Sequence, residues 1–381
     1  MFFELMYYNY LNNLVAASAR PQLPPRQLIP KTFDDMPSST FREQFRFAKE
    51  DIATLVHIFE LPEYIKLPNG SRLDAKLAVC ILLRKLVFPV RAGDLEDKFG
   101  IDRSVCSRAV NWLLHYINTN YGFLLLMRKC IVNTHKNTWS QAIASTANCP
   151  LDSCLGFIDG TNKAICRPVK YQKKTYSGHK RQHTLKYQGV VIPCGILFDL
   201  HGPHLGIRHD ARILVESDLL RRLEHAVPRG FYIYGDPAYR IQRFILGPYE
   251  QVTENTPESE FNSLMSKVRI SVEWSFGGLL NLFRSLQYAK HWRLYSQPVG
   301  LYYKIAAILY NIHGILYGNQ ISTYFNCRIA LQDYLHYCRD CLDASVDSTA
   351  FSETTDMVFE ETETTDCESD LEFDINDEEL I

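Results

Sequence analysis

Three acidic residues stand in sequence contexts that suit the binding of a hard cation. Asp159 occurs in Phe-Ile-Asp-Gly-Thr, Asp236 in Tyr-Gly-Asp-Pro and Glu273 in Ser-Val-Glu-Trp-Ser. Each aspartate follows a short apolar run and precedes Gly or Pro, a pattern typical of a buried strand that meets a turn. The glutamate lies in a segment whose apolar residues have helical spacing.

These contexts place the two aspartates where open α/β sheets bind ligands, because the carboxyl ends of neighbouring strands face one crevice. A third carboxylate on a nearby helix completes an oxygen cage of the kind that Mg²⁺ prefers. Asp159, Asp236 and Glu273 are therefore candidates for both catalysis and metal binding.

The composition predicts a globular chain with room for two or three domains. The chain has 381 residues, of which 46% are apolar. No apolar run reaches the roughly 18 residues of a membrane span. The N-terminus has neither a basic region nor a clear cleavage site, so we expect no secretory signal and no membrane partner.

The charge is distributed unevenly along the chain. From Asp340 onward there are 16 acidic residues and no Lys or Arg, whereas residues 1–339 carry a net charge of +14. A basic body with an acidic tail indicates a polyanion such as DNA as partner. The alternative is an ordinary solvated surface with a disordered end.

The eleven cysteines are scattered and odd in number, which fits a reducing compartment. Cys338 and Cys341 form one Cys-x-x-Cys without a second pair nearby. Because a zinc site usually needs four ligands, this pattern favours ordinary thiols.

The pattern predicts four regions: a flexible arm over 1–40, a helical domain over 41–140, a catalytic domain over 150–320 and a disordered acidic tail over 340–381. In the helical region we expect helices over most of 41–66, over 74–86 and 92–99, and from an N-cap at Asp102 to about Ile117.

The last two of these helices, separated by Gly100, have helix-turn-helix proportions. One face of the second helix is polar and resembles a recognition helix for DNA: Arg103, Ser104, Ser107, Arg108 and Asn111. A solvated face of an ordinary helical bundle is the alternative.

Residues 118–150 are expected to be helical, and strands follow. We predict strands over 157–159 and 164–167, a turn at 160–162 between them, and one long strand or a hairpin over 185–200. Further along we expect a helix over 212–223, a strand over 231–234, a short helix or loop over 241–246, and helices over 262–286 and 299–317. This order fits a mixed sheet with an antiparallel first part and a parallel continuation.

A basic loop precedes the long strand. Its Lys and Arg side chains would bind phosphates, and its tyrosines would stack on unpaired bases: Lys170, Tyr171, Lys173, Lys174, Tyr176, Lys180 and Arg181. His179 and His183 lie in the same segment. A solvated hairpin is the alternative.

The blocks around the three carboxylates resemble the DDE transposases of the PIF/Harbinger superfamily and their domesticated relatives. The resemblance covers roughly residues 154–313. Five blocks follow in the family's order: Ile158-Asp159-Gly160-Thr161, Gly206-Ile207-Arg208-His209-Asp210-Ala211-Arg212-Ile213, Tyr234-Gly235-Asp236-Pro237-Ala238-Tyr239, Val272-Glu273-Trp274-Ser275-Phe276-Gly277, and Asn311-Ile312-His313, where the family usually has Leu-His-Asn. One departure is Asn162, where the family commonly has His; asparagine still donates and accepts hydrogen bonds.

The resemblance implies an α/β, ribonuclease H-like catalytic domain and two-metal-ion chemistry. Asp159 would bridge two Mg²⁺ ions, for which Mn²⁺ can substitute, and Asp236 and Glu273 would hold one each. Water would nick DNA at a transposon end, and the freed 3′-hydroxyl would attack target DNA. The resemblance also implies a nuclear location, a homo-oligomer and a Myb-like partner protein.

Several roles stay open. Asp210 is either a fourth carboxylate of the site or an N-cap and support, and we favour the second. His209 is either a supporting group or a buried histidine. Glu273 has Arg269 four residues earlier, so the two can pair along a helix. For the whole chain, a domesticated DNA-binding or scaffold protein without nuclease activity is the main alternative, and a helix-turn-helix regulator is a third.

Overall fold

The computed structural model describes residues 30–148, 153–239 and 241–336. The predicted acidic tail, the Cys338–Cys341 pair and residues 1–29 lie outside the described residues. Residues 30–37 were predicted to belong to a flexible arm, and this is wrong. The ring of Phe33 lies 5.4 Å from the rings of both Phe45 and Phe99, and the Lys31 amide donates to the Phe99 carbonyl.

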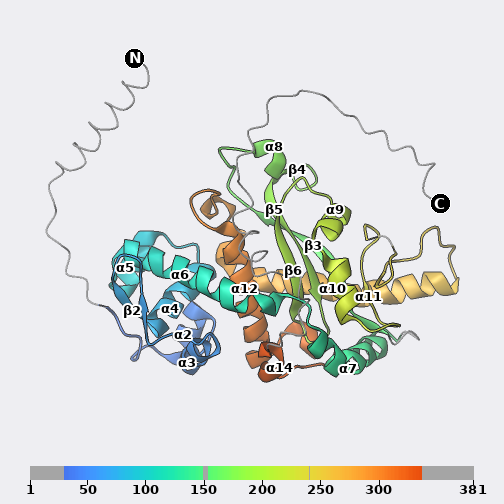
Figure 1. Ribbon diagram of the computed structural model, residues 1–381, viewed down its shortest axis with the longest axis horizontal. Helices are drawn as coiled ribbons and strands as arrows, with labels where there is room; N and C mark the ends of the chain where they lie inside the picture. The colour runs from blue at the N-terminus through green and yellow to red at the C-terminus, as the bar shows by residue number, and fades with distance from the viewer. Residues whose placement is uncertain (1–29, 149–152, 240, 337–381) are drawn as a thin grey trace, which may run out of the picture.

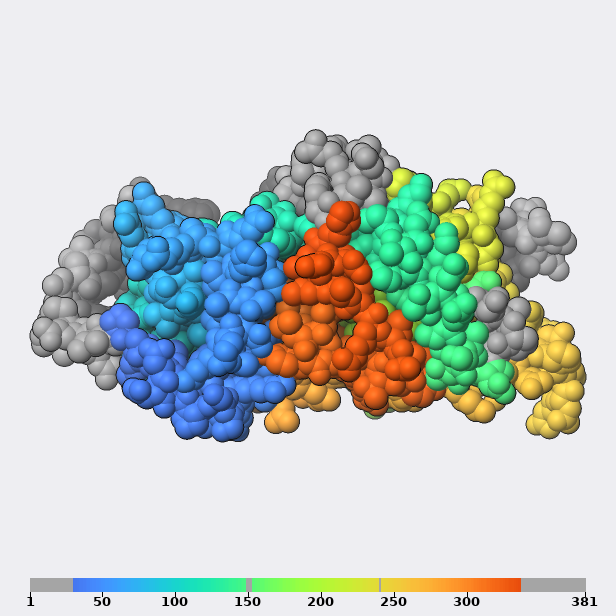
Figure 2. Space-filling view, turned by 90° about the horizontal axis from the view of Figure 1, so that it is seen from below, coloured from blue at the N-terminus to red at the C-terminus, as the bar shows by residue number. Residues whose placement is uncertain are grey.

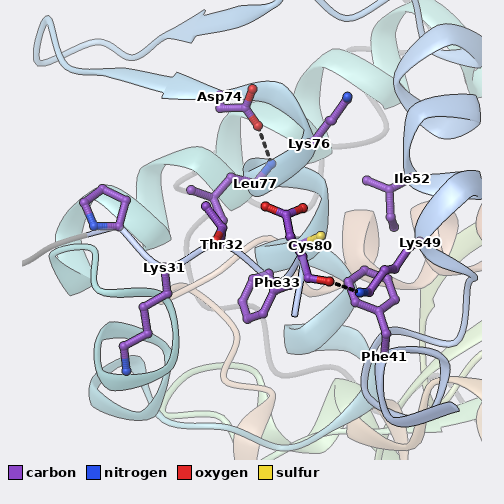
Figure 3. Close-up of a pocket in the computed structure, with 12 residues that line it drawn as sticks. Lys31, Thr32, Phe33, Phe41, Lys49, Ile52, Asp74, Lys76, Leu77 and Cys80 are labelled. Atoms are coloured by element: carbon purple, nitrogen blue, oxygen red, sulfur yellow. Dashed lines mark hydrogen bonds between the residues drawn. The ribbon is translucent and has the colours of Figure 1, made fainter. Parts of the chain in front are cut away.

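A hollow of about 300 Å³ lies beside this segment (Figure 3). Lys49 Nζ donates to the Asp34 carbonyl oxygen at 2.6 Å and closes one side of it. Asp74 stands on its rim and caps the following helix by accepting from the Leu77 amide at 2.9 Å. The start of the described chain is therefore part of the helical region.

The helical region consists of short helices around one small hairpin. Its elements are α2 (Ser38–Phe45), α3 (Lys49–Ile58), β1 (Tyr64–Lys66), β2 (Arg72–Asp74), α4 (Ala75–Val87), α5 (Ala92–Phe99), α6 (Arg103–Tyr121), η1 (Gly122–Leu125) and α7 (Lys129–Ala147). The stretch 41–66 is mostly helical, as predicted, and its last three residues instead form β1, which pairs with β2.

The predicted stop and start around residue 100 are confirmed. Gly100 ends α5 with a left-handed φ of 64°, a conformation that glycine adopts without strain. Asp102 caps α6 by accepting from the Ser104 amide at 2.8 Å. The helix runs to Tyr121, one turn beyond its predicted end.

The predicted mixed sheet is present. Its strands are β3 (Cys154–Ala164), β4 (Tyr176–Ser177), β5 (Gln182–Val191), β6 (Leu197–Leu205), β7 (Tyr232–Tyr234) and β8 (Ile245–Leu246). β3 pairs antiparallel with β5 and parallel with β7; β5 continues antiparallel to β6, and β7 continues parallel to β8. This mixed α/β arrangement is compatible with a ribonuclease H-like domain.

The predicted turn at residues 160–162 is wrong. β3 continues without interruption to Ala164, and the predicted second strand over 164–167 does not form. The reason is the neighbouring strand, since β5 pairs with β3 at every position from Phe157 to Ala164. Ladder hydrogen bonds over this length outweigh the local turn preference of a Gly-Thr-Asn sequence.

Several observed helices and strands differ from the predicted ones in type or bounds. The segment 185–200 is a hairpin, and the helix predicted over 212–223 is split at Asp218, whose φ is 54°. Residues 245–246 form a strand and not the expected helix or loop. The split helix and its successors are α9 (Asp210–Glu216), α10 (Leu219–Ala226) and α11 (Pro257–Leu282), which begins five residues before its predicted start.

The C-terminal helices join the two regions. They are α12 (Val299–Tyr317), as predicted, α13 (Gln320–Tyr324) and α14 (Leu331–Leu335). α12 packs against α6 on one side and β6 on the other, between the helical region and the sheet (Figure 1). In Figure 2 the C-terminal residues, orange to red, fill the space between the blue helical region and green α7.

Among the described residues, α12 alone has the length and hydropathy of a membrane span. Of its 18-residue apolar window, 78% is buried inside the protein, as in the core helix of a folded domain.

Candidate active site

Asp159 lies within β3, at the point where the strand leaves the core. Phe157 and Ile158 before it are fully buried, whereas the Asp159 side chain is 18% exposed. Its Oδ1 accepts a hydrogen bond from the Gly160 amide at 2.8 Å. The carboxylate therefore stands on the best-paired strand of the sheet and still reaches the surface.

Asp236 lies at the same edge of the sheet as Asp159. The parallel register sets Phe157 beside Tyr234, so each aspartate comes two residues after a paired position. Asp236 Oδ1 accepts from the Ala238 amide at 3.0 Å, which orients the carboxylate in the turn after β7. This register therefore brings the two strand-end carboxylates close together, as the sequence predicts.

Glu273 reaches the site from α11, and an arginine links it to Asp159. Arg269 Nη1 lies 3.3 Å from Asp159 Oδ2, and Arg269 Nη2 lies 3.2 Å from Glu273 Oε1. The i,i+4 pair of Arg269 and Glu273 that the sequence allowed is thus present, and the same guanidinium also binds the strand carboxylate. One cation therefore stands between two of the three predicted acidic residues.

The electrostatics of Asp159 reflect its burial and its charged neighbours. Burial raises the pKa of Asp159 to about 6. The Gly160 amide and Arg269 oppose this shift, whereas the negative charges of Asp236 and Glu273 add to it. Carboxylates that repel each other in this way favour the binding of a cation.

Asp210 is a close neighbour of this site. It is the first residue of α9, where His209 holds the N-cap position, so the prediction that Asp210 caps the helix is wrong. Its carboxylate pairs with Lys186 Nζ at 3.2 Å. A Cβ added to Gly160 would stand 2.8 Å from Asp210 Oδ1, so a side chain at this position would require the Asp210 carboxylate to shift.

A buried tyrosine lies under the aspartates, and the sequence analysis gave it no role. Tyr239 is 1% exposed, and burial raises its pKa far above the usual value, with Asp210, Asp159 and Asp236 adding to the shift. Gln188 Nε2 donates to the Tyr239 hydroxyl oxygen at 3.3 Å. Its position in the Asp-Pro-Ala-Tyr block, three residues after Asp236, is the sequence feature that could have placed this tyrosine near the site.

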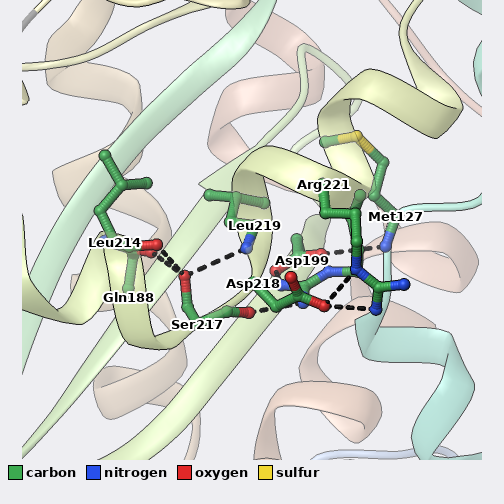
Figure 4. A network of polar contacts seen from close by, with 9 residues as sticks. Met127, Gln188, Asp199, Leu214, Ser217, Asp218, Leu219 and Arg221 are labelled. Carbon is green, nitrogen blue, oxygen red and sulfur yellow. Dashed lines mark hydrogen bonds and ion pairs between the residues drawn. The ribbon is translucent and has the colours of Figure 1, made fainter. Parts of the chain in front are cut away.

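A polar network continues behind Gln188 (Figure 4). Ser217 Oγ donates to Gln188 Oε1 at 3.1 Å. Nearby, Arg222 and Asp199 form a buried ion pair at 2.9 Å, and Asp199 Oδ2 accepts from the Met127 amide at 3.1 Å. These bonds connect β5, β6 and α10, and β5 pairs with β3, the strand that carries Asp159.

The oxygen donors match a hard divalent cation in kind, because Mg²⁺ is bound through carboxylates and water. Their placement does not form a closed cage: no group of three His, Cys, Asp or Glu side chains in the described part of the chain is placed to hold a metal ion. The Arg269 guanidinium occupies the space between Asp159 and Glu273 instead. The residues therefore fit the ion chemically, and a closed cage needs the arginine to move.

The predicted DNA contacts fall into two groups. In the basic loop, α8 (Gln172–Thr175) carries Lys173 and Lys174, and Lys174 Nζ lies 5.2 Å from the centre of the Tyr171 ring. Lys174 and His209 line one hollow of about 360 Å³ near Asp210. The remaining loop cations, Lys170, Lys180 and Arg181, are exposed.

The second group lies far from the carboxylates. Arg103 and Arg108 are exposed on α6, which lies on the other side of α12 from the sheet (Figure 1). Asn162, which replaces the family's usual His, accepts from Thr184 Oγ1 at 3.4 Å within the sheet.

Residues 158–311 match the family model described as DDE superfamily endonuclease. No curated protein and no solved structure matches the chain. The matched stretch begins one residue before Asp159, includes Asp236 and Glu273, and ends at Asn311. It therefore contains all three carboxylates and, apart from the first four residues of β3, the sheet beside them.

Proposed function

We propose that the DDE endonuclease domain over residues 158–311 makes this chain a DNA transposase of the PIF/Harbinger type. It would cleave phosphodiester bonds at transposon ends and join those ends to target DNA. The observation that carries the proposal is that Asp159 and Asp236 stand at one edge of the mixed sheet, with Glu273 of α11 linked to Asp159 through Arg269. The matched family supports the nuclease class, and the order of blocks around the carboxylates supports the narrower assignment.

In this proposal the three carboxylates hold two Mg²⁺ ions, with Mn²⁺ as a substitute. Bound ions would stabilise the charge on the attacking and leaving oxygens of an in-line displacement. The Gly160 amide orients the Asp159 carboxylate and the Ala238 amide orients that of Asp236, so each aspartate is already positioned by its own backbone. Water would attack phosphorus, the P–O bond to the 3′-oxygen would break, and that oxygen would leave as the 3′-hydroxyl.

The surroundings of the site provide the proposed grip on DNA. The cations of the basic loop would follow the backbone beside the carboxylates, with affinity that falls as salt rises. The polar face of α6 would contact DNA farther away. A nuclear location, a homo-oligomer and a Myb-like partner protein belong to the same proposal, and all three rest on the resemblance.

The test is a cleavage assay on DNA that carries candidate element ends. We expect nicking by the wild type only with Mg²⁺ or Mn²⁺, and at least a hundredfold loss for Asp159→Asn, Asp236→Asn or Glu273→Gln. Asp218→Asn is the matched control, because Asp218 lies on the surface of α10 and pairs with Arg221. Wild-type rates in Asp236→Asn would rule the proposed chemistry out.

The Arg269 bridge favours one alternative, a transposase-derived DNA-binding or scaffold protein without nuclease activity. A guanidinium between Asp159 and Glu273 offsets part of their negative charge without a metal ion. DNA binding without cleavage under any metal, together with a single-copy gene that lacks flanking inverted repeats, would support this alternative. Several gene copies flanked by terminal inverted repeats would support the transposase.

A further inference from the structure

A second positively charged surface lies at the end of α11, away from the carboxylates and the basic loop. A hollow of about 370 Å³ opens where the end of α2 meets the end of α11 and the start of α13. Its lining includes two arginines and several amide or aromatic side chains: Arg46, Trp274, Asn281, Arg284, Tyr310 and Gln320. We call it the Arg46–Arg284 hollow.

The two arginines come from different regions of the chain and are held near each other. Arg46 follows α2 in a left-handed conformation, with a φ of 67°, and its Nε donates to the Leu282 carbonyl at 3.2 Å. Arg284 begins η2 (Arg284–Gln287), two residues after Leu282. The backbone bond fixes the Arg46 guanidinium at the end of α11, beside the second cation.

The two positive charges repel each other. Burial and the charge of Arg284 lower the pKa of Arg46, and the acidic group that opposes this is Glu43, on α2. No Asp or Glu of the described residues forms an ion pair with either arginine. Two like charges that face one hollow without an acidic partner favour the binding of an anion there.

The hollow lies on the same exposed face of α11 as Glu273. From Glu273 this side of α11 continues through Gly277 and Asn281, at intervals of four residues, and Arg284 follows just after the helix ends at Leu282. A Cβ added to Gly277 would meet no atom within 4 Å, so the surface between the carboxylate and the hollow is open. Glu273 and Asn281 are separated by about 12 Å along the helix, at 1.5 Å per residue.

We propose that the Arg46–Arg284 hollow holds a phosphate of the DNA strand that passes Glu273. The proposal rests on the proposed function, since it takes DNA as the substrate. A spacing of about 12 Å corresponds to three or four nucleotides of one strand at about 3.4 Å each. Both regions of the chain then bind the strand three or four nucleotides from the scissile phosphate. Arg46 belongs to the helical region and Arg284 to the catalytic domain.

The first test measures the affinity of a fluorescent duplex in EDTA, where no cleavage occurs. We expect Arg284→Gln to weaken binding about three- to tenfold and Arg284→Glu to weaken it further, while Arg284→Lys stays within about twofold of the wild type. The slope of log K against log salt should fall by about 0.9 for the lost contact. Arg229→Gln is the control, because Arg229 is exposed before β7, at the opposite edge of the sheet.

Arg46 needs a second readout, because its Leu282 bond also supports the fold. Thermal unfolding of Arg46→Gln is therefore compared with its DNA affinity, and Arg46→Lys keeps the charge. A larger side chain at Gly277, where the surface is open, offers an independent test. Gly277→Glu should weaken DNA binding, whereas Gly277→Ala should leave it unchanged, since Ala projects only a methyl group there.

The second test locates the contact on the DNA. Single phosphates are replaced by neutral methylphosphonates around the nicked position. In the wild type, one replacement three or four nucleotides away should weaken binding, and in Arg284→Gln the same replacement should have no further effect. Wild-type affinity in both Arg284→Gln and Arg284→Glu would refute the hollow alone, whereas a wild type that binds no DNA would refute the proposed function as well.

Discussion

Arg269 lies 3.3 Å from Asp159 and so binds the carboxylate that is predicted to hold metal. The same guanidinium reaches Glu273 at 3.2 Å. In the absence of a metal ion, this arrangement relieves the repulsion between a strand carboxylate and a helix carboxylate. A divalent cation at this site would therefore compete with the Arg269 side chain for the same oxygens.

The competition predicts how an Arg269 variant responds to Mg²⁺. We expect Arg269→Gln to be less stable than the wild type by about 1 kcal/mol in EDTA, because the two carboxylates then lack their cation. Added Mg²⁺ should stabilise the variant more than the wild type, since binding to the folded state raises stability by mass action. Urea unfolding with and without Mg²⁺ measures both effects, with Arg243→Gln as control. Equal stabilisation of variant and wild type by Mg²⁺ would show that Arg269 does not compete.

Asp210 supports the site through Lys186 and is expected to matter less than the three carboxylates. Asp210→Asn should lower the cleavage rate by less than tenfold, against at least a hundredfold for Asp236→Asn. A double-mutant cycle with Lys186→Met should give a coupling energy of about 1 kcal/mol in urea unfolding, because the two groups form a half-buried ion pair. A cleavage rate for Asp210→Asn as low as that of Asp236→Asn would instead make Asp210 a fourth catalytic carboxylate.

Asn311, the last residue of the matched stretch, is predicted to be structural. It is fully buried; its Oδ1 accepts from the Leu197 amide and its Nδ2 donates to the Leu197 carbonyl, both at 2.9 Å. Asn311→Leu leaves both backbone groups unpaired inside the protein and should cost about 2–4 kcal/mol of unfolding free energy. Urea unfolding tests this, with the exposed Asn120→Leu on α6 as comparison. A loss below about 0.5 kcal/mol would contradict the role.

His313 predicts a pH dependence of stability. Burial lowers its pKa to about 4, and the positive charge of Arg42 adds to the shift. The groups around it are Arg42, Arg46 and Asp51 and the rings of Phe47 and Tyr317.

The unfolded chain has an ordinary histidine pKa of about 6.5 and therefore binds a proton that the folded chain does not. The contribution of His313 is complete above about pH 6.5 and is lost as the pH falls from there to about 4. His313→Gln should flatten the pH dependence of the urea midpoint across this window, whereas His115→Gln, at an exposed position of α6, should not. An unchanged slope in His313→Gln would assign the pH dependence to other groups.

Local sequence was enough to predict the elements whose signals lie within a few residues. α12 has its predicted bounds because apolar side chains cover it on all sides, and Asp102 caps α6 because its own carboxylate reaches the next turn. The two aspartates were correctly placed at one edge of a mixed sheet. Each of these predictions needed only a short window of sequence.

The errors arose where a distant segment decides the local conformation. β5 keeps Gly160–Asn162 extended, and the two residues of β8 form a strand only because β7 lies beside them. Arg269 was read as a partner of Glu273 alone, since nothing in the helix indicates that Asp159 lies opposite. Tyr239 is bonded to Gln188, which comes 51 positions earlier in the chain, so a short window of sequence does not show this contact.

The bond from Arg46 to the Leu282 carbonyl has a mechanical consequence. α11 is one continuous helix that carries Glu273, and its C-terminal end is bonded to Arg46 of the helical region. Asp159 and Asp236 stand on the sheet, and Arg269 of the same helix binds Asp159. One helix therefore joins the helical region directly to Glu273 and, through Arg269, to the first strand carboxylate.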